Sequence, residues 1–451
     1  MTTTDDLLAD APEGIRLVAG TLRRGEWGEA FRERRRVVTW HVTEAGLVAP
    51  AVVEERGTAV RRHRAGASLL VARSGDGPEA LRDAVREAAR RAGGSPFFKA
   101  ARAADRKSPL AAEPFAEEES KTARLSSAIA HALADPRGVS LSLSISATLL
   151  TRAVITPREA LSCGTRSTLV ARGTVSRSDR RRPFAFQSSR PFSEAVGDLV
   201  AALAVAIRPV VCAAAPEGDV DAVLLPSAAA AFFHEVVGHA LEADGPERAS
   251  VLARVPGAAV GPRGLFVTDD PLRLDLPGAY ETDDEGTPAE RVPLLLDGRV
   301  ADRLRDRRAG APGSNGHGRT PDFRRPPRAR MGNIAVEPGE RTVEELMSLC
   351  GTGVLVREVS AGTADPESGR FVLAVERAEG IRRGRSTGPV APFSLAGDAL
   401  AALAALDAER GREAPAASGL AVCVKAGDAI LVGGVSPAIL VRGLHARGGT
   451  R

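Results

Sequence analysis

One apolar segment that carries two histidines and an adjacent carboxylate constrains the fold of this chain more than any other stretch. Residues 227–244 are rich in alanine and large apolar residues, which predicts a buried helix with Ser227 as its N-cap. His234, Glu235 and His239 lie inside this segment. A buried imidazole or carboxylate is costly unless it has a partner. A divalent metal would satisfy both histidines and leave the glutamate beside a metal-bound water, which is the chemistry of a zinc hydrolase.

The two histidines are five residues apart, whereas the common His-Glu-x-x-His motif places them four apart. At about 100° per residue, His239 would lie roughly 140° round a regular α-helix from His234, too far to share one ion. We therefore predict a π-type turn or a helix end at Val237 to Gly238, because glycine tolerates both. Replacing Gly238 with isoleucine should weaken metal binding, since a β-branched side chain is stiff.

At these residues the sequence resembles the TldD/PmbA family of metalloproteases, whose TldD-type members carry a His-Glu-x-x-x-His signature. Other stretches resemble landmarks of the family in the family's order. They are Asp283–Thr287, Asn315–Arg319, Pro327–Asn333, Gly362–Thr363 with Gly369–Phe371, and Cys423–Lys425. Together these stretches cover roughly residues 220–445. Ala243, Gly332 and Val424 depart from the family's usual residues, and none of them is a proposed ligand.

A hydrolytic zinc site uses three protein ligands and a water, so the histidine pair needs a third partner. Cys423 is the best candidate, because it lies in a strand-like run beside a turn and matches the family's cysteine ligand near the C-terminus. Taken alone, a single cysteine is more often a small buried hydrophobe. We interpret the remaining cysteines as structural and four histidines as incidental: Cys163, Cys212 and Cys350, and His41, His63, His131 and His445.

Several other polar residues allow two interpretations. His317 and Arg319, at the glycine-rich stretch 311–318, could stabilise an oxyanion or belong to a flexible surface loop. Glu242 and Asp244 could accept hydrogen bonds from the ligand imidazoles or form a charge pair at the surface. The acidic turn Asp283–Glu285 is by default a solvated loop.

The first domain is predicted to span residues 1–216 and to be α+β. Short β-like runs in residues 14–73 precede a helix that begins at Pro78, and a surface loop follows at 100–120. A helix at 121–134 leads into the strictly alternating strand Val139–Ala147. Further strands at about 148–155, 165–175 and 183–188 precede a helix capped by Ser193.

The second domain, residues 217–451, is predicted to be rich in strands and to carry the metal-binding helix. Closely spaced glycine and proline residues between 256 and 340 disfavour long helices there. Two short helices are expected, one opened by the capping box at Thr342 and closed by Gly351, and one over Ala399–Arg410. We expect a mainly antiparallel barrel or curled sheet, which the family resemblance also implies.

Composition indicates an ordinary globular protein. A formal charge of +4 on 451 residues is weak support for a polyanionic partner, and the runs Arg34–Arg36 and Arg180–Arg182 fit solvated strand ends. The N-terminus lacks a signal-peptide pattern, and no apolar run is long enough to span a bilayer. We expect a cytoplasmic protein without a disulfide framework.

The sequence therefore predicts a zinc-dependent metallopeptidase. Zn²⁺ would be held by His234, His239 and Cys423, and Glu235 would be the general base that assists attack by the zinc-bound water. The resemblance implies unfolded or extended peptides as substrates, and a homodimer or a heterodimer with a PmbA-type subunit. The alternatives are a non-catalytic partner or peptide-binding scaffold and, with less support, a nucleic-acid or nucleoprotein binding regulator. The sequence leaves open which peptide is cleaved, and whether cleavage is endo- or exoproteolytic.

Overall fold

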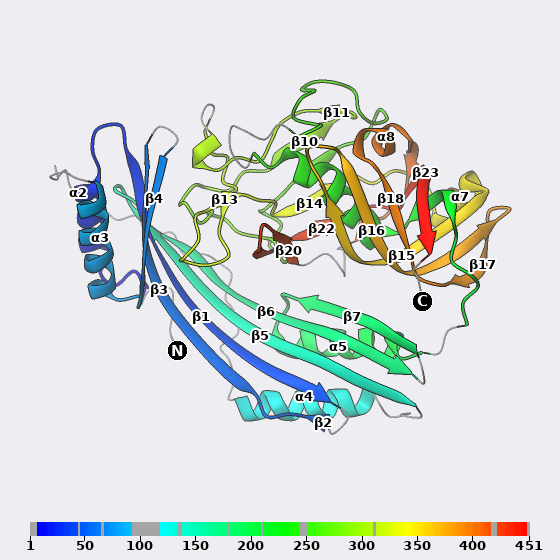
Figure 1. The fold of residues 1–451 in the computed structure, drawn as a ribbon, viewed down its shortest axis with the longest axis horizontal. Helices are drawn as coiled ribbons and strands as arrows, with labels where there is room; N and C mark the ends of the chain where they lie inside the picture. The colour runs from blue at the N-terminus through cyan, green and yellow to red at the C-terminus, as the bar shows by residue number, and fades with distance from the viewer. Residues whose placement is uncertain are drawn as a thin grey trace.

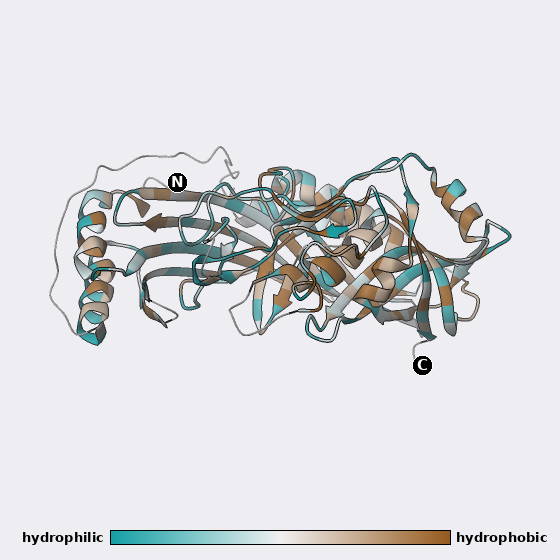
Figure 2. Ribbon diagram, turned by 90° about the horizontal axis from the view of Figure 1, so that it is seen from above, coloured by the Kyte–Doolittle hydropathy of each residue, from teal (hydrophilic) through white to brown (hydrophobic). Residues whose placement is uncertain are grey.

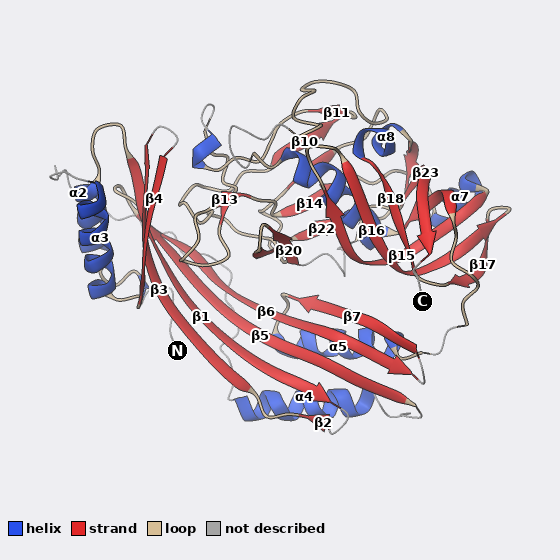
Figure 3. Cartoon of the chain, in the orientation of Figure 1, coloured by secondary structure: helices blue, strands red, loops and turns tan. Residues whose placement is uncertain are grey.

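The chain forms a long curved sheet that lies along one side of a strand-rich body (Figure 1). The computed structural model describes residues 7–43, 46–64, 67–92, 118–132, 138–177, 180–208, 211–243, 250–309, 313–415 and 422–448. Helices and strands are both abundant and are distributed along the whole chain (Figure 3). This arrangement confirms the predicted α+β class.

The N-terminal half forms a seven-stranded antiparallel sheet. Six strands follow the order β4-β3-β1-β5-β6-β7, and the short β2 (Gly46–Leu47) pairs beside them with β1. The six strands are β1 (Trp27–Thr43), β3 (Ala51–Arg64), β4 (Ala67–Ser74), β5 (Val139–Ile155), β6 (Ala160–Arg177) and β7 (Arg180–Ser188). They are longer than the sequence predicted, because antiparallel partners stay in register over most of their length.

One face of this sheet carries helices, and the other faces the C-terminal half of the chain. The helices are α2 (Ala11–Thr21), α3 (Pro78–Ala92), α4 (Glu118–Ala132) and α5 (Phe192–Ala206). On β1, Ala30 packs with α2 and α3, and Trp40 packs with α4 and α5. Phe31 points to the opposite face and contacts Phe323 of the C-terminal half. Both hydrophobic and hydrophilic residues lie along the long strands in Figure 2.

The predictions for this half were mostly confirmed. The helices near residues 78 and 121–134 exist, and the alternating strand continues to Ile155. Helix α2 was not predicted, and the predicted cap was wrong: α5 begins at Phe192, after Pro191, so Ser193 lies inside the helix. Arg34 lies in the middle of β1 rather than at a strand end, paired with Asp76 at 2.6 Å. Most of the predicted loop at 100–120 lies outside the described residues.

Five strands of the C-terminal half close into a barrel. The order is β15-β8-β23-β18-β16, and β16 pairs back with β15. These strands are β8 (Gly218–Leu224), β15 (Thr352–Ala364), β16 (Arg370–Arg382), β18 (Phe393–Asp398) and β23 (Ile439–Gly448). Of the five pairings, β15 with β8 is parallel and the others are antiparallel. The predicted, mainly antiparallel barrel is therefore confirmed.

A second sheet packs with the barrel around one core, and the metal-motif helix lies within that core. The sheet order is β11-β10-β9-β14-β22. Its strands are β9 (Val267–Asp269), β10 (Val292–Leu296), β11 (Arg299–Val300), β14 (Asn333–Val336) and β22 (Gly433–Val435). Two hairpins complete this half, and they pair β12 (Gly318–Arg319) with β13 (Arg328–Ala329), and β20 (Val422–Lys425) with β21 (Asp428–Leu431).

Of the two short helices predicted here, one is confirmed and one is only half right. Thr342 makes both hydrogen bonds of a capping box at the start of α7 (Val343–Cys350), and Gly351 ends the helix. The alanine-rich stretch forms α8 over Ala399–Ala404 only. The chain then forms β19 (Leu406–Arg410), because pairing with β23 outweighs the helix propensity of these residues. No helix among the described residues is long and apolar enough to cross a bilayer.

Candidate metal centre

The motif helix changes its winding where the two histidines lie. Helix α6 (Pro226–Phe233) begins at Pro226 with Leu225 as its N-cap, so the prediction of Ser227 as N-cap was wrong. From His234 to Gly238 the chain forms a π-helix, and the backbone N–H of His239 donates to the carbonyl of His234. This five-residue hydrogen-bond step places both histidines on one face. The predicted π-type turn is therefore confirmed.

Gly238 leaves room for a neighbouring side chain. A Cβ atom on Gly238 would lie 1.9 Å from Sδ of Met331, whose side chain is fully buried. A Cβ atom therefore fits at this position only if the buried Met331 side chain or the π-turn moves.

We expect Gly238→Ala to reduce zinc binding, because the added methyl group must push the π-turn or Met331 out of position. Overpacking of this kind typically costs about 1–3 kcal/mol. Zinc content after dialysis and the thermal midpoint would measure both effects. Gly197→Ala is the matched control, since a Cβ atom there meets nothing within 4 Å. Unchanged zinc retention in Gly238→Ala would contradict the steric argument.

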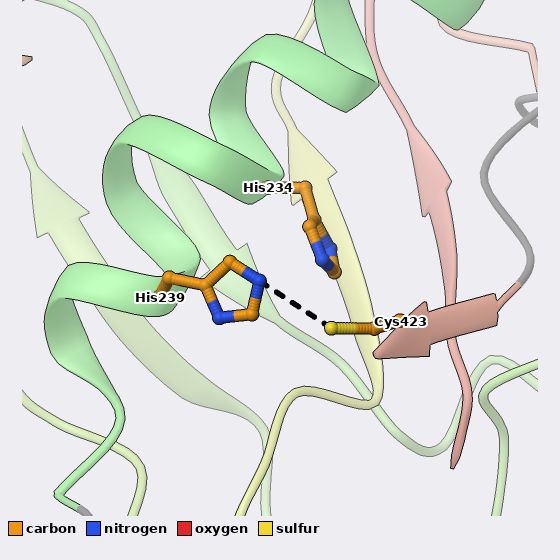
Figure 4. A group of neighbouring side chains, drawn as sticks. All are labelled: His234, His239 and Cys423. Atoms are coloured by element: carbon orange, nitrogen blue, oxygen red, sulfur yellow. Dashed lines mark hydrogen bonds between the residues drawn. The ribbon is translucent and has the colours of Figure 1, made fainter. Parts of the chain in front are cut away.

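Three metal-binding atoms meet at this turn. His234, His239 and Cys423 are all buried, and their ligand atoms lie within 4.8 Å of one another. Cys423 comes from β20, 184 residues further along the chain than His239, and its Sγ lies 3.3 Å from Nε2 of His239. Figure 4 shows the two imidazoles and the sulfur pointing toward one another. Tertiary folding therefore brings the predicted ligand set together.

Glu242 holds His239 in its orientation. Its carboxylate lies 3.0 Å from Nδ1 of His239, accepts from Lys425 Nζ at 2.6 Å, and accepts the backbone N–H of Met331 at 3.0 Å. Because Nδ1 is occupied in this way, Nε2 remains available to a metal. Of the two interpretations of Glu242, the structure supports the hydrogen-bond acceptor over the surface charge. Asp244 lies outside the described residues.

The charges of the site shift three pKa values. Burial raises the pKa of the Cys423 thiol, but hydrogen bonds and charges from His234 and His239 outweigh burial and lower the pKa to about 5. Burial lowers the pKa of His239, but Glu242 and Cys423 raise it to about 10. Burial also raises the pKa of Glu242, yet Lys425 and His239 hold it well below its usual range. The site therefore favours a Cys423 thiolate beside a positive charge. A bound metal ion can supply that positive charge in place of the proton on His239.

The donor set fits a zinc ion. Two imidazoles and one thiolate are zinc ligands, and three protein ligands leave one tetrahedral position for water. Nδ1 of His234 is also a buried polar atom with no hydrogen-bond partner among the described residues.

Glu235 lies beside the three ligands and borders a cavity. Its carboxylate is 3.9 Å from Nε2 of His239, and burial raises its pKa against the opposing charges of both histidines. A Cβ atom on Gly362, in β15, would lie 2.5 Å from Oε1 of Glu235. Backbone thus packs directly against this carboxylate, at a position where a side chain would displace it.

The cavity, of about 740 Å³, lies between the N-terminal sheet and the barrel. Its walls come from β6 and β7, from the β15 segment 359–364, and from the hairpin strand that carries Cys423. His234, Glu235 and His239 also line it. A substrate in this space can therefore reach the metal ligands and the candidate base together.

His317 and Arg319, which were predicted as oxyanion groups, contact other residues. Both are buried and are absent from the lining of this cavity. Nε2 of His317 lies 3.0 Å from Asp269, and Arg319 donates to the carbonyl of Met331 and lies over the ring of Tyr280. Neither is in a flexible surface loop.

The prediction of a solvated loop at the acidic turn was wrong, because Asp283, Asp284 and Glu285 are buried. The Asp283 carboxylate accepts backbone N–H groups of Glu285, Thr287 and Gly318. The other two carboxylates also accept backbone N–H groups, and Asp284 is paired with Arg152 of the N-terminal sheet. The turn therefore ties the two halves of the chain together.

The residues interpreted as incidental or structural are not among the three gathered ligands. Cys163 and Cys350 are buried and Cys212 is half-buried. His63 packs against Trp27, and the exposed His445 pairs with Asp219. His41 is exposed on β1, and the side chain of His131 is not among those described.

Sequence reasoning missed three residues that contact the site: Lys425, Gly362 and Arg330. Nothing in their immediate sequence indicates a metal centre. All three nevertheless lie in stretches that carried the family resemblance, and this was the available signal.

Comparison with known proteins assigns the second half of the chain to a protein family. Residues 217–448 match the family model described as the PmbA/TldA metallopeptidase C-terminal domain. A metalloprotease of Methanothermobacter thermautotrophicus is 30% identical over 243 residues, which are 52% of this chain and 52% of that protein. A zinc metalloprotease TldD homolog of Saccharolobus solfataricus is 26% identical over 238 residues, 51% of this chain and 52% of that protein. The chain thus spans about half the length of the curated relatives it matches.

Two crystal structures share the fold along nearly the whole chain. TldE from Thermococcus kodakarensis has a TM-score of 0.70 and 18% identity, covering 94% of this chain and 97% of that one. A Thermotoga maritima protein described as a modulator of a DNA gyrase has a TM-score of 0.72 and 16% identity, covering 98% and 99%. At these identities, the likeness concerns the fold alone.

Proposed function

This chain belongs to the PmbA/TldD family, and on that premise we propose that it is a zinc-dependent metallopeptidase. The observation that carries the proposal is the meeting of His234, His239 and Cys423 within 4.8 Å beside Glu235. Relatives that match the second half of the chain are named metalloproteases, which agrees with it.

The residues of the site divide the chemistry as follows. His234, His239 and Cys423 would hold the zinc ion, which supplies a Lewis acid that activates water and polarises a carbonyl. Glu235, whose pKa burial raises, takes the proton from the attacking water and returns it to the leaving amine. Glu242 keeps Nε2 of His239 directed at the metal.

We further propose that the substrates are unfolded or extended peptides. The cavity has room for several residues of an extended chain but not for a folded domain. Strand β7, the edge of the N-terminal sheet, lines it, and an edge strand offers unpaired backbone groups to a peptide. The zinc ligands lie in the same cavity, so a captured peptide would reach the site of cleavage.

For assembly, we propose a dimer, either of two copies or with a PmbA-type subunit. The family resemblance motivates this proposal, and the shared fold of TldE agrees with a partner of similar architecture. A silent subunit is the less favoured role for this chain, because the chain retains the two histidines, the glutamate and the cysteine in one place. The arginine runs remain the sole support for nucleic-acid binding, and Arg34 is already paired with Asp76.

The test is metal analysis together with hydrolysis. The full chain, purified without chelator, is expected to contain about one zinc per chain and to cleave a fluorescently labelled unfolded polypeptide, alone or with a PmbA-type partner. Dipicolinate should remove both properties, and added zinc should restore them. A preparation that holds well under one zinc per chain and still cleaves would remove the metal from the proposal.

A further inference from the structure

Arg330 is a buried cation that contacts the Cys423 ligand and does not line the cavity. It lies between β13 and β14 and is 2% exposed. One terminal nitrogen of its guanidinium lies 3.2 Å from Sγ of Cys423 and 3.2 Å from the Cys423 carbonyl. The other donates to the carbonyl of Asp428 at 3.3 Å, on the same hairpin. Arg330 thus binds the sulfur and the backbone that carries it.

The same side chain reaches the second support of the site. Nε of Arg330 lies 3.6 Å from the carboxylate of Glu242, which also pairs with Lys425. Two cations, Arg330 and Lys425, therefore face two anions, Glu242 and the Cys423 thiolate. These two cations offset the charge of the two anions, while Glu235 adds a further carboxylate beside the ligands.

This balance matters because a thiolate is a strong donor. A sulfur ligand gives electron density to zinc and weakens its Lewis acidity, which hydrolysis needs. Hydrogen bonds to a ligand sulfur withdraw part of that density, and in other metal centres they tune the metal in this way. A charge-assisted bond from a guanidinium is the stronger kind.

We propose that Arg330 sets the electrophilicity of the zinc ion through its hydrogen bond to the Cys423 thiolate. It is a positioning residue, which acts through Cys423 and does not touch substrate. The inference rests on the proposed metallopeptidase function, and it assigns to this chain the means by which a site with a cysteine ligand stays hydrolytic.

Hydrogen bonds from neighbouring residues fix the backbone segment that carries Arg330. Its backbone N–H donates to the carbonyl of His317 at 3.0 Å. His317 is fixed by Asp269, and Asp269 also accepts the backbone N–H of Gly332 at 3.0 Å. Arg319 donates to the carbonyl of Met331. The two residues predicted to act on the oxyanion instead anchor the segment that presents Arg330.

The experiment compares wild type with Arg330→Gln and Arg330→Lys, each loaded with Co²⁺ or with zinc. In Arg330→Gln, the thiolate-to-cobalt charge-transfer band should move to longer wavelength, because the sulfur loses a charged donor. In the zinc form, kcat should fall about 10- to 100-fold, the usual effect of such outer contacts, with KM nearly unchanged. Arg330→Lys keeps the charge without the planar fork and should shift the band part of the way.

Arg410→Gln is the matched control, since Arg410 is also buried but donates to backbone carbonyls distant from the metal ligands. Its band and kcat should equal those of wild type. If wild type shows no thiolate-to-cobalt band, the metal centre itself is wrong and the inference falls with it. A wild-type band that stays in place in every Arg330 variant that folds would overturn the role of Arg330 alone. If neither variant folds, the Co²⁺ form of wild type still tests the role of Arg330. Without the Arg330 hydrogen bond, its charge-transfer band would lie at the wavelength of small cobalt–thiolate complexes whose sulfur accepts no hydrogen bond, and that result would overturn the inference.

Discussion

Glu235→Gln is expected to lower kcat by about 10²- to 10⁴-fold, the usual contribution of a general base. The amide cannot take a proton from the attacking water, although it keeps the size of the side chain. Glu235 is not one of the three gathered ligands, so the zinc content should stay at that of wild type. The measurement is steady-state cleavage of an unfolded polypeptide together with metal analysis of the same preparation.

Glu358→Gln provides the control for this change. Glu358 is a partly exposed glutamate of β15 that pairs with Arg377, and its loss should leave kcat within error of wild type. Full activity in Glu235→Gln would remove Glu235 as the base. Activity lost together with zinc would instead assign Glu235 to the ligand set.

His239→Ala should abolish both zinc binding and hydrolysis, which makes it the most severe single change that we predict. It removes a ligand whose Nε2 lies 3.3 Å from Cys423 Sγ and whose Nδ1 is held by Glu242. Two remaining ligands, His234 and Cys423, do not make a stable site for zinc, which requires three protein ligands in hydrolases. Metal analysis after dialysis should give well under one zinc per chain, and cleavage should fall to the uncatalysed background.

His445→Ala is the matched control for His239→Ala. His445 is exposed on β23 and pairs with Asp219, so its removal should change neither zinc content nor kcat. If His239→Ala kept one zinc per chain, another residue would have to complete the site. Because His239→Ala loses the metal whereas Glu235→Gln keeps it, the pair separates binding from catalysis.

Local backbone geometry was predictable from the sequence, because it depends on neighbours a few residues apart. The five-residue spacing of His234 and His239 excluded a regular α-helix, and the structure has a π-turn there. The capping box at Thr342 and the alternating strand from Val139 follow from the same short-range rules. Local signals failed where two short patterns competed, as at Ala399–Arg410, where strand pairing replaced the second half of the helix.

The choice of Cys423 as third ligand required more than local pattern. The strand-like run and the turn around Cys423 do not by themselves mark it as a ligand, and His239 is 184 residues away. The resemblance to the TldD/PmbA family supplied the pairing, and the structure places the sulfur beside His239. The proposed ligand set was thus available before the structure, although its geometry was not.

What the sequence alone determined is the α+β class, the buried motif helix, the break in its winding and the residues able to bind zinc. The tertiary structure decided which polar residues surround them. Asp283, Glu285 and His317 resembled loop residues, yet they are buried. Each pairs with a group from a distant part of the chain: the backbone N–H of Gly318, the backbone N–H of Arg307 and the Asp269 carboxylate, respectively. Arg330 gave no signal of its own in the sequence, because the feature that distinguishes it is the contact of its guanidinium with Cys423 Sγ, a residue distant in the chain. Burial and charge pairing are set by contacts between distant segments, whereas periodicity and capping report the local chain alone.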